Sequence, residues 1–143
     1  MRSLAILAPI FVLALWTFIV LNVVGISRIR AAARKIVGPD DFRLGESDRV
    51  PERVRVANRN YMNLLELPVL FYTLCILVYV TGMSTTVMLV LAWLYVALRV
   101  AHSVIHLSSN NVIHRLRAFV GSNAVLLVMW VMAAIGLWQQ PAV

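Results

Sequence analysis

Three polar side chains stand at helical spacing where a long apolar run begins: Arg59, Asn63 and Glu66. Separations of four and then three residues put them on one face of a helix, because an α-helix has about 3.6 residues per turn. The stripe presents a guanidinium, an amide and a carboxylate. Ionisable side chains within a membrane helix normally face protein or a water-filled cavity, so this stripe is a candidate functional site.

A second polar stripe lies towards the end of the apolar run at about 86–106 and consists of Arg99, His102 and His106. Its members are three and then four residues apart. If the two runs form an antiparallel hairpin, both stripes lie at the same depth and predict one shared site. An ion pair between Arg99 and Glu66 that only holds the helices together is the alternative. The two histidines have the spacing of metal ligands, but without a third ligand we expect no metal.

These stripes belong to a sequence of 143 residues with 62% hydrophobic residues and a mean hydropathy of +0.86. That is too apolar for a soluble domain. Crossing a bilayer takes about 20 apolar residues in a helix, and four runs qualify. We expect a single domain over residues 1–143, an all-α integral membrane four-helix bundle with spans at about 4–26, 56–83, 86–106 and 118–138. The first run is longer than a signal-peptide core, so we expect it to be retained as a helix.

The net charge of +7 is distributed unevenly. Most basic residues lie in the first loop, at about 27–55, and two more, Arg115 and Arg117, lie between the third and fourth runs. This asymmetry predicts that both basic loops are cytoplasmic and both termini are outside. It favours contact with the headgroups of membrane lipid, and we expect no nucleic acid partner.

The second helix is expected to begin near Pro51 and to extend to about Val80, projecting from the bilayer at its start. Pro68 follows Glu66 by two residues. A proline inside a helix removes a hydrogen bond and clashes with the preceding turn, so we expect the helix to loosen or kink there.

The pattern Arg59-x3-Asn63-x2-Glu66 followed by Pro68, together with Arg99-Val100-Ala101-His102 and a downstream basic turn, resembles the MAPEG family. These are the membrane-associated proteins in eicosanoid and glutathione metabolism. The second stretch is most similar to that of the microsomal prostaglandin E synthases. The overall length and short termini resemble bacterial members, which implies the bacterial inner membrane.

The resemblance implies a homotrimer that binds glutathione, or another low-molecular-weight thiol, at each subunit interface on the cytoplasmic side. Glu66 would suit the amino group of the thiol compound and Arg59 a carboxylate, and Arg28 or Arg30 would reach in from a neighbouring subunit. The residues that the resemblance implies for thiol binding are Arg28, Arg30, Arg59, Asn63, Glu66, Arg99 and His102.

For catalysis, the resemblance implies that Arg115 or Arg117 stabilises the thiolate. The thiolate would attack a lipophilic small molecule that enters from the bilayer. His106 stands where the family usually has a tyrosine, and it would donate a hydrogen bond to sulfur or act as a general base.

Three classes of function stay open. The first is a glutathione-dependent transferase or peroxidase. The second is a non-catalytic lipid-binding or scaffold protein of the same family, and the third is an accessory subunit of a larger membrane complex.

Overall fold

The structure is a computed structural model that describes residues 3–139. It is 80% helical, and the described residues form no strand. The elements, in chain order, are η1 (Leu4–Leu7), α1 (Ala8–Ala33), η2 (Pro39–Phe42), α2 (Glu52–Leu65), α3 (Pro68–Val80), α4 (Thr86–Leu107) and α5 (Val112–Trp138).

Four helical segments are long and apolar enough to cross a membrane: Leu4–Ala33, Glu52–Val80, Thr86–Leu107 and Val112–Trp138. The prediction of an all-α, multi-pass membrane protein is therefore confirmed. The first and second segments extend beyond the apolar runs, into residues with charged side chains, because helix propensity and not hydropathy decides where a helix ends.

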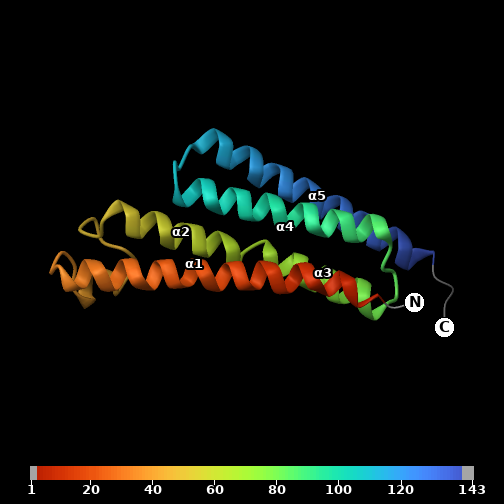
Figure 1. Ribbon diagram of the computed structural model, residues 1–143, viewed down its shortest axis with the longest axis horizontal. Helices are drawn as coiled ribbons and strands as arrows, with labels where there is room; N and C mark the ends of the chain where they lie inside the picture. Colours follow the sequence, from red (N-terminus) through yellow and green to blue (C-terminus); the bar gives the residue numbers. More distant parts are fainter. Residues whose placement is uncertain (1–2, 140–143) are drawn as a thin grey trace.

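The segments form an elongated bundle in which α4 packs along α5, and α1 runs beside α2 and α3 (Figure 1). The loop of residues 34–51 and the turn of residues 108–111 lie at the same end, which we call the basic end. At this end α1 and α2 extend further than α4 and α5 (Figure 1).

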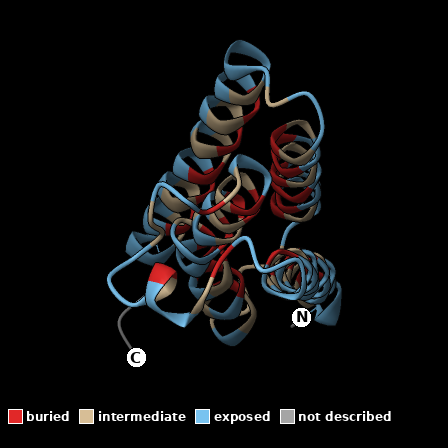
Figure 2. Cartoon of the chain, turned by 90° about the vertical axis from the view of Figure 1, so that its left-hand side faces the viewer, coloured by how far each residue is buried: buried red, intermediate tan, exposed pale blue. Residues whose placement is uncertain are grey.

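Apolar side chains cover the outside of the bundle as well as its core. Leu13, Phe71 and Tyr95 are fully buried, whereas Phe11 is 72% exposed and Leu127 is 65% exposed. Figure 2 shows the buried residues on the inward sides of the helices and the exposed residues outside. Such an exterior is stable only where lipid replaces water around it, since large exposed apolar surfaces are otherwise unfavourable.

The second membrane segment is interrupted at Glu66 and Leu67, as the position of Pro68 predicts. Glu66 leaves the helical region, with φ −82° and ψ −98°. Helix α3 starts again at Pro68, and its first turn bonds to the preceding residues: the Val69 amide donates to the Glu66 carbonyl at 3.2 Å and the Leu70 amide to the Leu67 carbonyl at 3.0 Å. Proline is tolerated at the first position of a helix because the N–H it lacks has no partner there.

The loop of residues 34–51 folds back onto α1 and α2. Lys35 adopts a left-handed conformation with φ 54°, and the Ile36 amide donates to the Ala31 carbonyl, which ends α1. Val37 and Val50 then pack with Ala31 and α2 in a small apolar cluster. Apolar contacts therefore order a segment whose composition alone predicts only a polar connection.

Asp41 holds this loop together. Its carboxylate accepts hydrogen bonds from the Gly38 amide at 2.8 Å and from the Ser47 hydroxyl at 2.6 Å. These two bonds lower the pKa of the Asp41 carboxyl from its ordinary value. The carboxylate is therefore the form that the folded loop favours.

We expect acid to open the loop. Because the pKa of Asp41 is lower in the folded loop than in the unfolded chain, the stabilisation is complete above the unfolded value of about 3.9 and is lost as the pH falls through the folded value. D41N should expose the Gly38 amide to faster hydrogen exchange at neutral pH, because it removes the carboxylate that accepts from this amide. D40N changes an exposed neighbour and should leave that rate unchanged; equal rates in both variants would contradict the role given to Asp41.

Candidate functional site

A cavity of about 430 Å³ opens between α2, α4 and α5 near the basic end. It lies where the polar stripes of α2 and α4 face the start of α5. Its lining residues are Val56, Arg59, Met62, Asn63, Glu66, His102, His106, Asn110, Val112, Arg115, Leu116 and Phe119.

The charged side chains that line this cavity form no ion pair with one another within the described residues. Within the described residues the ion pairs are Arg28 with Glu46 and Arg55 with Asp48. Neither Arg59 nor Glu66 takes part in one, although both line the cavity and both are exposed. The cavity therefore offers a cation and a carboxylate to a ligand.

Arg115 is fixed at the cavity by two neighbours. Its Nη1 donates to the Asn110 Oδ1 at 2.6 Å and lies 3.4 Å from the His106 Nε2. Its own carbonyl lies 3.0 Å from the His102 Nδ1. A carbonyl can only accept and an arginine can only donate, so the proton of His102 is on Nδ1, and His106 accepts through Nε2.

The turn between α4 and α5 makes these contacts. Asn110 adopts a left-handed conformation with φ 49°, and its amide donates to the Ile105 carbonyl at 2.8 Å. Asn111 then caps α5, because its Oδ1 accepts from the Ile113 and His114 amides. The reversal brings Arg115, nine residues after His106 in the sequence, back beside that imidazole.

Arg99 lies inside the bundle and does not line the cavity. It is fully buried, its Nε donates to the Tyr95 hydroxyl at 3.1 Å, and its guanidinium stacks over the Phe119 ring at 5.2 Å. Its Nη1 and Nη2 have no hydrogen-bond partner within residues 3–139, and it forms no ion pair with Glu66 there. Phe119 lines the cavity and contacts both Arg99 and His102, with the His102 ring 5.6 Å away. Arg99 can therefore influence the cavity through the electrostatic field of its positive charge, and not by direct contact with a ligand there.

The remaining basic candidates lie elsewhere. Arg117 is exposed and does not line the cavity. Arg28 pairs with Glu46 at 3.3 Å and stacks over the Phe42 ring at 5.0 Å. Arg30 lines a different groove, between α1 and α2. A role for Arg28 or Arg30 at a neighbouring subunit stays a prediction.

Two buried residues that sequence reasoning missed join α2 to α4. The Asn60 Nδ2 donates to the Ser103 hydroxyl at 2.7 Å, and both side chains are fully buried. The signal was available, since Asn60 shares the helical face of the core residues Ala57 and Leu64. Asn110 was also missed, because no pattern in the sequence indicates that the side chain of a turn asparagine accepts a hydrogen bond from Arg115, five residues later.

The described residues include no group of three or more His, Cys, Asp or Glu side chains that could hold a metal ion. The cavity is lined by two arginines, one carboxylate, two imidazoles and two amides. These groups bind a small zwitterion and stabilise an anion.

A model of the MAPEG family matches residues 6–135 of the chain. No curated protein and no solved structure matches the chain.

We expect S103A to loosen the contact between α2 and α4. The Asn60 amide would lose its acceptor in a buried site, at a cost of about 1 kcal/mol. S108A is the matched control, because the Ser108 hydroxyl is exposed and bonds only to the Val104 carbonyl of its own helix. Thermal unfolding in detergent measures both; equal melting temperatures would show that the Asn60–Ser103 bond does not stabilise the bundle.

Proposed function

Because this chain belongs to the MAPEG family, we propose that it is a membrane-bound, glutathione-dependent transferase or peroxidase that acts on a lipophilic electrophile. The family includes such enzymes as well as non-catalytic members. The observation that carries the proposal is the gathering of Arg59, Glu66 and Arg115 around one cavity.

The charges of the cavity match those of glutathione. This tripeptide has two carboxylates, one ammonium group and a thiol. Arg59 is suited to a carboxylate and Glu66 to the ammonium group. Both belong to one helical face, and Asn63 stands between them for a peptide amide. Hydrogen bonds between charged partners are about twice as strong as neutral ones, so these contacts would orient the tripeptide.

The opposite wall of the cavity suits the thiol. A free thiol has a pKa of about 8.5 and is mostly protonated at neutral pH, whereas the thiolate is the nucleophile. The Arg115 guanidinium, held by Asn110 and His106, supplies a fixed positive charge. A cation beside sulfur favours the thiolate, so Arg115 is the residue to which the proposal gives its stabilisation.

The reaction then follows from the thiolate. In transfer, the sulfur lone pair forms a bond to an electrophilic carbon, and the leaving group or the opened epoxide oxygen takes the displaced electron pair and a proton. In peroxide reduction, sulfur attacks the hydroperoxide, the O–O bond breaks and the alcohol leaves. A second glutathione then forms the disulfide and releases water.

The exposed apolar side chains at the rim of the cavity support the proposal of a lipophilic acceptor and of a second subunit. Met62, Val112 and Leu116 line it and are 50%, 62% and 56% exposed. Such apolar side chains would contact an acceptor that enters from the bilayer. In this proposal the active form is a homotrimer in which a neighbouring copy covers the exposed side of the cavity.

Glutathione binding to the detergent-purified protein tests the proposal. R59Q and E66Q each remove one charge-assisted contact and should weaken binding by about tenfold or more, since such hydrogen bonds contribute about 1.5–3 kcal/mol. R117Q removes the same charge from outside the cavity and should leave binding unchanged. Calorimetry gives the affinities; no binding to the wild type would refute the proposal and favour the non-catalytic or accessory-subunit classes.

The thiolate step has its own test. R115Q should raise the pKa of bound glutathione and move the rise of the pH–rate profile, or of thiolate absorbance in the ultraviolet, to higher pH by about one unit. N110A should move it in the same direction by less, because it only loosens Arg115. R117Q again serves as the control, and a profile that R115Q leaves in place would exclude Arg115 as the stabilising cation.

A further inference from the structure

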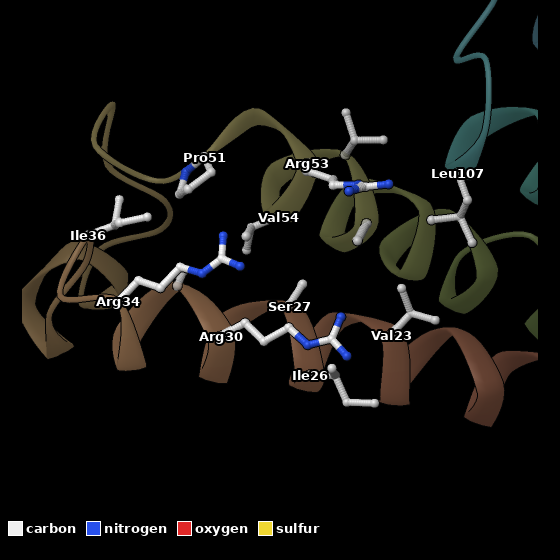
Figure 3. Close-up of a pocket in the computed structure, with 13 residues that line it drawn as sticks. Val23, Ile26, Ser27, Arg30, Arg34, Ile36, Pro51, Arg53, Val54 and Leu107 are labelled. Atoms are coloured by element: carbon white, nitrogen blue, oxygen red, sulfur yellow. The ribbon is translucent and has the colours of Figure 1, made fainter.

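A second basic hollow lies apart from the cavity between α2, α4 and α5, which we call the thiol cavity. A groove of about 580 Å³ lies between α1 and α2 at the basic end. Figure 3 shows it with Arg30 extending from α1, Arg34 from the residue that follows α1, and Arg53 from α2. We call it the α1–α2 groove; it is lined by Val23, Ile26, Ser27, Arg30, Ala31, Arg34, Ile36, Pro51, Arg53, Val54, Val56, Ala57 and Leu107.

The three arginines of the groove have no acidic partner. No aspartate or glutamate lines it, and the ion pairs of the described residues belong to Arg28 and Arg55. Three like charges around one hollow repel each other, because no carboxylate compensates them. The groove is therefore complementary to an anion.

The other half of the groove is apolar. Val23 and Ile26 lie on α1 towards the middle of the membrane segment, and they are 39% and 48% exposed. From Arg34 back to Val23 the helix rises by about 16 Å, at about 1.5 Å per residue. An occupant would thus meet cations at one end and apolar side chains over the next three turns.

The position of the groove relative to the bilayer indicates which kind of anion would bind there. Arg30 lies near the end of the first membrane segment, Leu4–Ala33, and Arg53 near the start of the second, Glu52–Val80. This is the level at which lipid phosphates lie when the apolar parts of the segments span the hydrocarbon core. A phosphate there would have its acyl chains directed along Val23 and Ile26.

We propose that the α1–α2 groove is a specific site for an anionic phospholipid, with the phosphate held by Arg34 and Arg53 and supported by Arg30. The guanidinium groups bind phosphate oxygens in a planar, bidentate manner. The apolar floor holds the upper part of an acyl chain, which inorganic phosphate would leave empty. This site shares only Val56 with the lining of the thiol cavity, and it does not depend on the proposed function.

The site differs from the general attraction of basic loops for anionic membranes. A general attraction depends on the number of charges, so removing any arginine of the loop weakens it equally. A specific site depends on which arginine is removed. Arg43 lies in the same loop, is exposed, forms no ion pair within the described residues and does not line the groove, so R43Q is a charge-matched control.

Native mass spectrometry of the full chain in neutral detergent tests the proposal, with added phosphatidylglycerol, phosphatidylcholine of the same chain length, or inorganic phosphate. Wild type should bind phosphatidylglycerol about tenfold more tightly than phosphatidylcholine. R34Q and R53Q should each weaken phosphatidylglycerol binding about tenfold, the loss expected when one charge-assisted hydrogen bond to the phosphate is removed. R43Q should stay within about twofold of wild type.

Helix content and melting temperature in the same detergent show whether R34Q and R53Q are folded, and E66Q, which changes only the thiol cavity, should retain the lipid. Equal losses in R34Q, R53Q and R43Q would overturn the proposal in favour of diffuse attraction. Binding of inorganic phosphate with the same affinity as the lipid would replace it with a free-anion site. Lipid-independent self-association that R34Q and R53Q abolish would overturn it in favour of a contact between copies of the chain.

Discussion

The cost of placing ionisable side chains against lipid governs the arrangement of this bundle. Hydrocarbon offers such groups no hydrogen bonds, so they must lie inside the protein, in a water-filled hollow or at the interface. Arg99 takes the first solution, fully buried between aromatic rings and the Tyr95 hydroxyl. Arg59 and Arg115 take the second, at the cavity, and Arg34 takes the third.

Helix α2 separates two sites of different character. One face carries Arg59 and Glu66 to the thiol cavity, and another carries Arg53 to the α1–α2 groove; Val56 lines both. The break at Glu66 and Leu67 ends α2 at the depth of the cavity, so the last polar residue of the stripe lies at a helix end. A straight helix would continue past this depth with its backbone groups fully paired. The basic end of the bundle thus has two hollows, one lined by cations and a carboxylate and one lined by arginines and apolar side chains.

Several of these features follow from local patterns. Hydropathy over about 20 residues reports lipid exposure, and helical spacing reports a shared face, so the class of fold and the grouping of Arg59, Asn63 and Glu66 were predictable. The hairpin geometry also placed His102 and His106 at the depth of that stripe. Pro68 predicted the interruption because its effect acts within one turn. The order of the loop around Asp41 was not predictable, since it depends on contacts among valines distant in sequence.

By itself, the sequence determined the membrane class, the four helical passes, the family and the two polar stripes, because each depends on residues within a few turns of one helix. The tertiary structure decided which members of those stripes share a hollow. It put Arg115 at the cavity and Arg117 outside it, buried Arg99 behind the lining and turned Arg30 towards α2. The physical reason is rotation: neighbouring residues of a helix point about 100° apart, so packing against other helices, and not position in the chain, selects which one faces the site.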